Sequence, residues 1–324
     1  MKRIVFLGNS IACSVAMEEI RNADPGSELL FFPLEGGLPY KRELAAKYIA
    51  KEISFKELLF KPQDFYKRSN VQVHTKELNR INFRKNQIST EEKEAIPFDV
   101  LVIAGAQDFK FPDIKGVNKI GVYAWKKLDD INKIFNEVPL IDTVVIQGDG
   151  PDGLELAQAF QKRGKEAILI TKASQDLPQA FAENPAEGEA IKPIQTIVDH
   201  TITEILGDSE AKAIRLSSGK VLATQLIIFT DVNLNLKFLS ETPLTINKSI
   251  VVDAQYRTNL KNVFACDWAC EAAEAQDLIQ QGKIVAGQIL NESNIGLQVS
   301  ALSGSTSLTI LSQSKDSQQL KADA

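Results

Sequence analysis

Histidine and cysteine are scarce in this chain, and the scarcity of each excludes a class of function. The 324 residues include two histidines and three cysteines. A mechanism built on several imidazoles is excluded, because only His74 and His200 are available. The cysteines are odd in number and show no metal-type Cys-x-x-Cys spacing, which argues against a secreted protein held together by disulfides.

An excess of positive charge and a long apolar run are also missing. The 37 Lys and Arg residues against 42 Asp and Glu residues give a net charge of −5, so the chain has no basic field that would attract nucleic acid or an anionic membrane. No apolar run approaches the roughly 18 residues that span a bilayer. The chain enters an apolar strand-like segment directly, and we expect no cleavable signal. We therefore expect a cytoplasmic protein that binds neither nucleic acid nor membrane.

The sequence does contain a regular alternation of apolar strand-like segments and amphipathic helical segments. Residues 2–20, KRIVFLGNSIACSVAMEEI, read as a buried strand, a glycine turn and a helix, and ELLFFPLEGG (28–37) follows as a second strand. FDVLVIAGA (98–106) is a continuous apolar segment, as in the strands of a parallel sheet that is buried on both faces. The pattern predicts an α/β fold with Rossmann-like domains.

A second strand–turn–helix–strand segment spans residues 140–173 and contains Gly148-x-Gly150-x-x-Gly153. In this motif the first glycine allows a tight turn, the second lets the backbone approach a pyrophosphate, and the third lets the helix pack closely on the strand. The phosphates lie at the helix N-terminus, where free N–H groups and the helix dipole favour anions. The segment predicts a dinucleotide site.

The turn of the first strand–turn–helix segment departs from this motif. It reads Gly8-Asn9-Ser10-Ile11-Ala12-Cys13, so Ser10 and Cys13 stand at the positions of the second and third glycines. A seryl hydroxyl can hydrogen-bond a phosphate, and cysteine is a small replacement for a packing glycine. This turn predicts a second dinucleotide site with an altered lining.

Two such segments in one chain, with Asp267 after a late strand, resemble the pyridine-nucleotide-dependent flavoprotein reductases that have two dinucleotide-binding folds. The most similar group contains the rubredoxin and ferredoxin reductases, the nitrite-reductase flavoprotein and the apoptosis-inducing-factor proteins. The resemblance covers residues 1 to about 290 and is carried by LPYKRELAAKYIAKEIS (38–54) and IVVDAQYRTNLKNVFACD (250–267).

The resemblance implies a division into domains. Residues 1–115 and 245–295 would form a discontinuous FAD-binding-like domain, into which an NAD(P)-binding-like domain of residues 116–244 is inserted. A short Ser-rich tail, 296–324, stands where the group has a much longer C-terminal interface domain. The resemblance implies that such a truncation would leave the flavin edge exposed, or would leave space for a partner protein to cover it. We expect this partner to be a small electron-acceptor protein or a partner subunit, and we expect a homodimer as a further assembly.

The resemblance also assigns site residues. Lys47 and Glu155 would form an ion pair beside the flavin ring and tune its potential, while the cofactor itself carries the chemistry. The FAD-binding residues would be Gly8, Ser10, Cys13, Glu35, Arg42, Lys47, Lys126 and Asp267, and the NAD(P)H-binding residues Gly148, Gly150, Gly153 and Lys172.

Several glycines of the group are replaced together. Residues 104–106 read Ala-Gly-Ala in place of Ala-Thr-Gly, and Asp231 and Cys266 each replace a glycine. Two interpretations are therefore open. In one, the chain is an NAD(P)H oxidoreductase whose FAD passes electrons to a small redox protein or another acceptor. In the other, it has lost FAD and serves as a scaffold or assembly subunit, or binds a metal or iron–sulfur cluster through Cys13, Cys266 and Cys270.

The end of the strand that completes the 140–173 segment gives a weak indication of whether the chain uses NADH or NADPH. The segment Ile170-Thr171-Lys172-Ala173 has no acid to accept hydrogen bonds from the ribose hydroxyls. Lys172 can meet a 2′-phosphate. The segment therefore slightly favours NADP(H).

Overall fold

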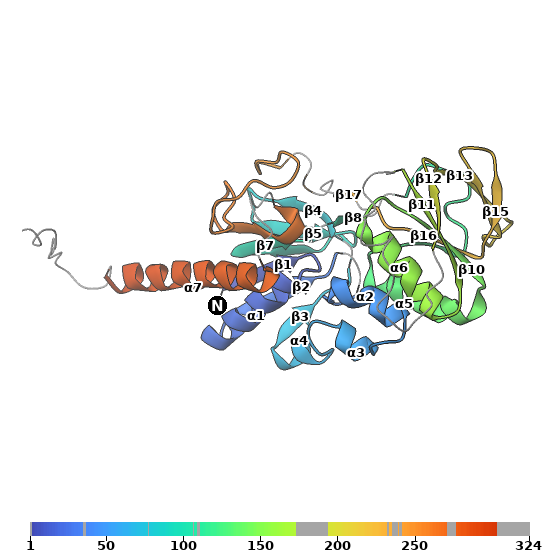
Figure 1. Cartoon of the computed structure of the whole chain (residues 1–324). Helices are drawn as coiled ribbons and strands as arrows, with labels where there is room; N and C mark the ends of the chain where they lie inside the picture. Colours follow the sequence, from blue (N-terminus) through green and yellow to red (C-terminus); the bar gives the residue numbers. More distant parts are fainter. Residues whose placement is uncertain are drawn as a thin grey trace, which may run out of the picture.

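Two parallel β-sheets, each with helices packed against it, form the two halves of this computed structural model (Figure 1). The residues described are 2–34, 37–76, 78–105, 107–108, 111–172, 194–231, 233–234, 239, 242–270 and 277–302.

The first sheet has β1 at its centre and the strand order β18-β7-β1-β2-β3, with all neighbours parallel. Its strands are β1 (Arg3–Leu7), β2 (Glu28–Phe32), β3 (Val71–Val73), β7 (Val100–Ala104) and β18 (Val263–Cys266). β7 is buried along its whole length, as its continuous apolar sequence predicts. The chain builds the second sheet before β18 returns to the first one, so the first sheet is assembled from distant parts of the sequence.

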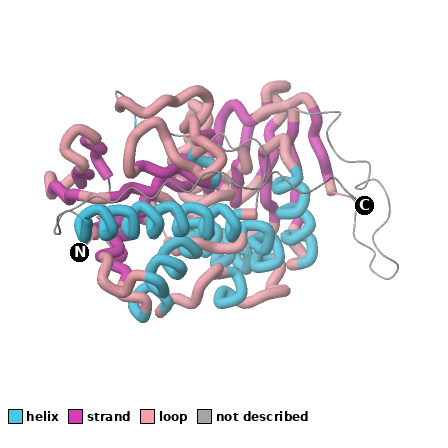
Figure 2. The backbone as a smooth tube through the Cα atoms, turned by 90° about the vertical axis from the view of Figure 1, so that its left-hand side faces the viewer, coloured by secondary structure: helices cyan, strands magenta, loops and turns pink. Residues whose placement is uncertain are grey.

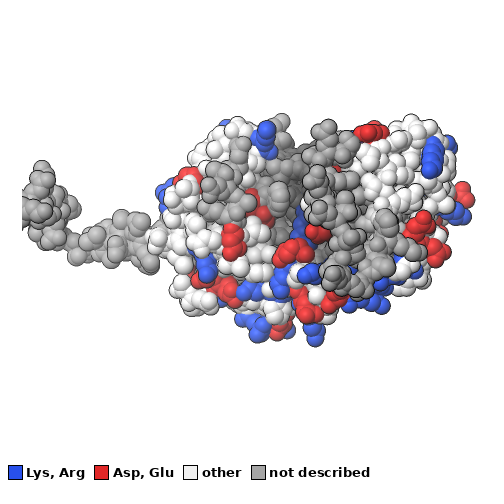
Figure 3. Space-filling model, in the orientation of Figure 1, with Lys and Arg blue, Asp and Glu red and all other residues white. Residues whose placement is uncertain are grey.

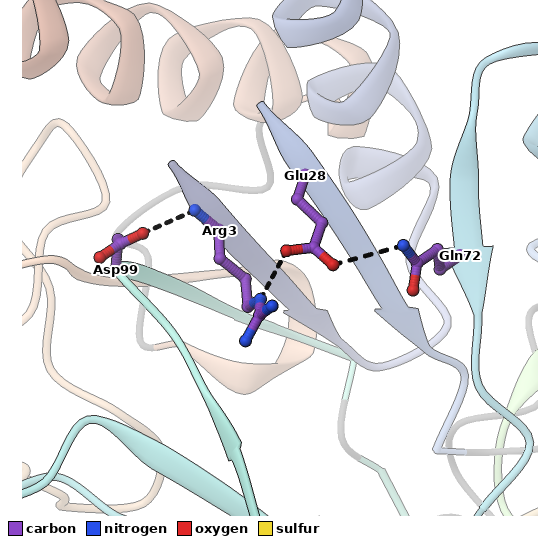
Figure 4. Close-up of polar contacts among 4 residues, drawn as sticks. All are labelled: Arg3, Glu28, Gln72 and Asp99. Atoms are coloured by element: carbon purple, nitrogen blue, oxygen red, sulfur yellow. Dashed lines mark hydrogen bonds and ion pairs between the residues drawn. The ribbon is translucent and has the colours of Figure 1, made fainter. Parts of the chain in front are cut away.

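Polar contacts hold the strands of the first sheet in register near their amino ends (Figure 4). The Arg3 guanidinium donates to the Glu28 carboxylate at 2.6 Å, and Gln72 donates to the same carboxylate at 3.3 Å. The Arg3 backbone N–H donates to Asp99 at 2.6 Å. These contacts leave the carboxyl edge of the sheet for the glycine turn that follows β1.

Helices α1 (Ile11–Ala23) and α7 (Leu278–Leu302) pack against each other beside this sheet (Figures 1 and 2). Gly282 makes the close approach possible, because a Cβ at this position would lie 2.5 Å from the Ala12 carbonyl oxygen. We call this sheet and these two helices the first unit. α7 continues past residue 296, where the sequence predicts the tail, and residues 303–324 lie outside the described part.

The second sheet has the order β12-β11-β10-β16-β9, again with parallel neighbours. Its strands are β9 (Val122–Ala124), β10 (Thr143–Gln147), β11 (Glu166–Thr171), β12 (Gln195–Val198) and β16 (Leu226–Phe229). Helix α6 (Pro151–Lys162) follows β10 and contacts β10 and β11, while α5 (Leu128–Glu137) contacts β9. We call this sheet and these helices the second unit.

Short antiparallel strands complete the described part. One sheet contains β4 (Leu78–Asn82), β5 (Gln87–Thr90) and β6 (Ala95–Pro97), and another contains β13 (Ile202–Leu206), β14 (Ala213–Leu216) and β15 (Val221–Ala223). β8 (Gln107–Asp108) pairs with β17 (Asn233–Leu234). The remaining helices are α2 (Ala45–Ile49), α3 (Phe55–Leu58) and α4 (Phe65–Arg68), with 3₁₀ turns at Arg42–Leu44, Val138–Leu140 and Asp267–Ala269.

The segment between β2 and β3 does not pack only on the first unit. Tyr48, Ile49 and Leu58 belong to the same buried apolar cluster as the α5 and α6 side chains of the second unit. The Tyr48 ring stacks on Phe135 of α5 with 4.4 Å between the ring centroids. Packing therefore joins this segment to the second unit, although the chain order places it inside the first. The division at residues 115 and 245 stays a prediction.

In the described part of the chain, no helix is both long and apolar enough to cross a membrane.

Candidate dinucleotide sites

The turn after β1 is built from a left-handed glycine and a self-capped helix. Gly8 has a φ of 103°, which favours glycine, and its N–H donates to the Phe32 carbonyl at 2.9 Å. Ser10 is the N-cap of α1, and its hydroxyl accepts from the Ala12 N–H at 3.0 Å. The first turn of α1 has no acidic side chain, so the positive end of this helix dipole is not neutralised there. The dipole of α1 fits a bound diphosphate, whereas the Ser10 hydroxyl is buried and already accepts the Ala12 N–H.

Cys13 and Cys266 lie in the apolar core of the first unit, fully buried. Burial raises the pKa of both thiols above the ordinary cysteine value, and Asp267 nearby raises them further. Cys13 and Cys270 also contribute to the raised pKa of the Cys266 thiol. Metal and cluster ligation needs thiolates, which this environment disfavours. No group of three His, Cys, Asp or Glu side chains within the described ranges has a metal-binding arrangement.

Asp267 stands at the carboxyl end of β18 with a left-handed φ of 56°. Its backbone N–H donates to the buried Gln281 side chain of α7 at 2.8 Å. This contact ties the residue to the helix that packs on α1, at the edge of the sheet where the Gly8 turn lies. The other residue predicted for ribose binding, Glu35, lies outside the described residues.

The basic residues predicted to hold the flavin lie where the two units meet. Arg42 donates to Asp152, in the first turn of α6, at 2.8 Å. Lys126 follows β9 and is only 3% exposed, and its backbone carbonyl accepts from the Tyr40 hydroxyl at 2.6 Å. Figure 3 shows acidic and basic side chains interspersed along the lower part of the face in view.

Lys47 and Glu155 lie on α2 and α6, two helices that contact each other. Both side chains are exposed, and among the described residues no ion pair joins them. The ion pairs that link these segments are Arg42–Asp152 at 2.8 Å and Lys162–Glu52 at 2.5 Å. The predicted pairing of Lys47 with Glu155 therefore differs from the arrangement seen, in which neighbouring residues carry the contact.

The three glycines after β10 have different surroundings. A Cβ at Gly148 would lie 1.8 Å from the Thr230 hydroxyl oxygen, and one at Gly153 would lie 3.0 Å from a methyl group of Leu169. A Cβ at Gly150 would meet no atom within 4 Å. Close packing thus leaves no room for a side chain at Gly148 and Gly153. The space beside Gly150 is open to a nucleotide diphosphate.

Two acids that the sequence reasoning did not assign to the nucleotide site surround this turn. The Asp149 carboxylate accepts from the Thr171 hydroxyl at 2.8 Å and from the Lys172 backbone N–H at 2.7 Å. Asp231 accepts from the Asp149 backbone N–H at 3.1 Å. The Lys172 residue predicted to bind the nucleotide is exposed. An acid inside the glycine motif was the signal that could have revealed this arrangement.

The carboxyl edges of both parallel sheets thus end in glycine turns at the N-termini of α1 and α6, which is the construction of dinucleotide-binding folds. A family model described as pyridine nucleotide-disulphide oxidoreductase matches residues 2–282. The chain belongs to this family. The expected membership and the α/β fold with two Rossmann-like domains are confirmed. FAD and NAD(P)H are the cofactors of this family, as expected for the chain.

Curated relatives and solved structures agree with this assignment. The chain is 24% identical over 303 residues to the assimilatory nitrate reductase electron transfer subunit of Bacillus subtilis (strain 168), covering 89% of this chain and 39% of that protein. It is 24% identical to the nitrite reductase [NAD(P)H] of the same organism, covering 82% of this chain and 34% of that protein. The chain thus spans well under half the length of these relatives.

Among solved structures, the ferredoxin reductase for the CYP199A2 system from Rhodopseudomonas palustris has a TM-score of 0.75 and 19% identity. The match covers 89% of this chain and 76% of the reductase. A likeness at this identity shows a shared fold.

Proposed function

We propose that the chain is an NAD(P)H-dependent flavoprotein oxidoreductase that passes electrons to a small redox protein or a partner subunit. When bound, FAD accepts hydride from the reduced nicotinamide nucleotide and releases electrons to the acceptor. The residues around Gly8 would hold FAD, and those around Gly150 would hold the nucleotide. The observation that carries the proposal is the pair of turns at the carboxyl edges of two parallel sheets. Gly8 in the first turn has a left-handed φ, and Gly148 in the second has no room for a Cβ.

The residues of the chain bind and orient the cofactors in this proposal. The N-terminus of α1 would stabilise the FAD diphosphate, and Asp267 would hydrogen-bond the ribitol chain. The buried Lys126 supplies a positive charge at the junction of the two units, where a reduced flavin would carry negative charge. Arg42 and Lys47 lie on the segment that contacts α6, so they reach the same junction.

A protein acceptor is supported by the printed names of relatives. One curated relative is an electron transfer subunit of nitrate reductase, and one similar structure is a putidaredoxin reductase bound to putidaredoxin. Location in the cytoplasm stays a prediction, supported by the scarcity of cysteine. Assembly as a homodimer also stays a prediction.

The second candidate is a flavin-free scaffold or assembly subunit. It is favoured by the Ser10 hydroxyl, which already satisfies the Ala12 N–H that a diphosphate would otherwise meet. The absorption spectrum of the purified full chain decides between the two. Bands at about 370 and 450 nm, the flavin chromophore, support the oxidoreductase. A colourless protein that releases no nucleotide on denaturation supports the scaffold.

Lys47 provides a residue-level test of the proposed function. We expect Lys47→Ala to lower the amount of flavin that copurifies or to shift its reduction potential, because a positive charge near the reduced ring is lost. Lys56→Ala is the matched control, since Lys56 is an exposed lysine on the neighbouring α3. Unchanged flavin content and potential in Lys47→Ala would contradict the assignment of this residue.

A further inference from the structure

The carboxylate of Asp149 lies at the carboxyl end of β11, although Asp149 belongs to the glycine turn after β10. Its Oδ1 atom accepts from the Thr171 hydroxyl at 2.8 Å and from the Lys172 N–H at 2.7 Å, and these two residues end β11 and follow it. In dinucleotide-binding folds, an acid at the end of this strand accepts hydrogen bonds from the adenosine ribose. Here the strand ends in Thr171 and Lys172, and the turn brings a carboxylate to the same place.

We propose that Asp149 is the residue that determines nucleotide specificity, and that it selects NADH over NADPH. The inference rests on the proposed function, because it assigns a role within the nucleotide site of that oxidoreductase. The carboxylate accepts hydrogen bonds from the 2′- and 3′-hydroxyls of an unmodified ribose and repels the 2′-phosphate of NADPH. The slight preference for NADP(H) inferred from Lys172 is replaced by this assignment.

The surrounding charges act in the same direction. Asp231 accepts from the Asp149 backbone N–H at 3.1 Å, and one of its carboxylate oxygens lies 3.2 Å from the position that a Cβ on Gly148 would take. Two carboxylates therefore border the turn. A 2′-phosphate would add like charges to this region, and like charges at short range disfavour binding. The exposed Lys172 ammonium is a solvated point charge on a flexible stem, which binds phosphate less specifically than an arginine fork.

The substitution Asp149→Asn removes the negative charge of the side chain but keeps its shape and its hydrogen-bond acceptor. An asparagine side-chain oxygen can still accept from the Thr171 hydroxyl and the Lys172 N–H, so the turn keeps its hydrogen bonds. Glu166→Gln is the matched control, because it also exchanges a carboxylate for an amide, at the exposed start of the same strand β11. The protein is used as purified, and binding of NAD⁺ and NADP⁺ is measured by calorimetry, which avoids reduction of any bound flavin.

We expect the unmodified protein to bind NAD⁺ at least tenfold more tightly than NADP⁺. We expect Asp149→Asn to weaken NAD⁺ binding about tenfold without weakening NADP⁺ binding, since charge-assisted hydrogen bonds to the ribose are lost and the repulsion is relieved. Glu166→Gln should leave the ratio of the two affinities within twofold. In the unmodified protein, the ratio of the NAD⁺ affinity to the NADP⁺ affinity should also fall toward one as the salt concentration is raised. Screening by salt weakens the repulsion between the carboxylates and the 2′-phosphate.

The outcomes separate the inference from the proposed function. The role of Asp149 is overturned if the unmodified protein binds both nucleotides equally or prefers NADP⁺. It is also overturned if Asp149→Asn leaves the ratio of the NAD⁺ and NADP⁺ affinities unchanged. The proposed oxidoreductase function stands in each of these cases. Failure of both nucleotides to bind the unmodified protein overturns the proposed function together with the inference. If Asp149→Asn does not fold, the salt dependence of the ratio in the unmodified protein decides: a ratio that narrows supports the role, and a constant ratio overturns it.

Discussion

Two glycines of the turn after β10 have different roles: Gly148 is required by packing, and Gly150 is proposed to lie beside the bound nucleotide. Gly148→Ala places a Cβ 1.8 Å from the Thr230 hydroxyl oxygen, and we expect the free energy of unfolding to fall by about 1–3 kcal/mol as the neighbours shift. Gly150→Ala meets no atom within 4 Å and has a φ of −104°, so we expect unchanged stability but weaker NAD⁺ binding. Denaturant unfolding and calorimetry measure the two effects. Wild-type nucleotide affinity in a folded Gly150→Ala protein would remove the binding role.

Because Cys13 and Cys266 are buried, we expect their thiols to be unreactive in the native protein. Burial raises the pKa of the Cys13 and Cys266 thiols, and only a thiolate reacts rapidly with a disulfide reagent. At pH 8 we expect neither thiol to react with a chromogenic disulfide in the native state, and all three cysteines of the chain to react after unfolding. Rapid reaction of Cys13 or Cys266 in the native protein would show that the first unit opens, and would reopen the possibility of thiolate ligation there.

At the scale of elements, the contact between α1 and α7 depends on one glycine. A Cβ on Gly282 would lie 2.5 Å from the Ala12 carbonyl oxygen and 2.7 Å from the Val15 Cβ, so the two helices must separate. We expect Gly282→Ala to lower the free energy of unfolding by about 1–3 kcal/mol. Because α1 presents the first dinucleotide turn, flavin content should fall as well.

Gly287 of the same helix is the control for this prediction. A Cβ there meets no atom within 4 Å. Gly287→Ala should therefore raise the free energy of unfolding by up to about 1 kcal/mol, since alanine has the higher helix propensity. Equal effects of the two substitutions, measured by thermal or denaturant unfolding, would contradict the close helix contact.

At the scale of the whole molecule, the segment that contains α2 joins the two units. The Arg163 guanidinium donates to the Ile49 carbonyl at 2.7 Å and lies 5.6 Å from the centre of the Phe135 ring. Tyr48 stacks on the same ring and donates its hydroxyl to Asn132 at 3.1 Å. Because α2 is held by the second unit while its flanking strands lie in the first, we expect the units to unfold together.

Tyr48 tests this coupling. Tyr48→Ala removes a side chain that is 7% exposed, and we expect the free energy of unfolding to fall by about 3 kcal/mol. Tyr48→Phe keeps the ring and loses only the hydrogen bond to Asn132, so about 1 kcal/mol should be lost. Tryptophan fluorescence and circular dichroism should report one coincident transition in the unmodified protein. Two separate transitions would show that the units are independent.

Features with local causes could be predicted from the amino-acid sequence. The buried strands β1 and β10, the helices that follow them and the glycine turns between them depend on apolar periodicity and on backbone conformations within about 20 residues. The left-handed Gly8 and the tight surroundings of Gly148 follow from the turn that each strand–helix connection requires. These local signals were sufficient to predict two dinucleotide-binding segments.

The side chains that meet across those turns could be identified only from the packing of the folded chain. Arg42 pairs with Asp152 rather than Lys47 with Glu155, and α2 enters the core of the second unit. Asp149 reaches the end of β11, where the sequence pattern indicated only Lys172. Contacts of this kind join residues far apart in the chain, and long polar side chains can choose among several partners. Their geometry is set by how helices and strands pack, because no local pattern fixes the distance between two elements.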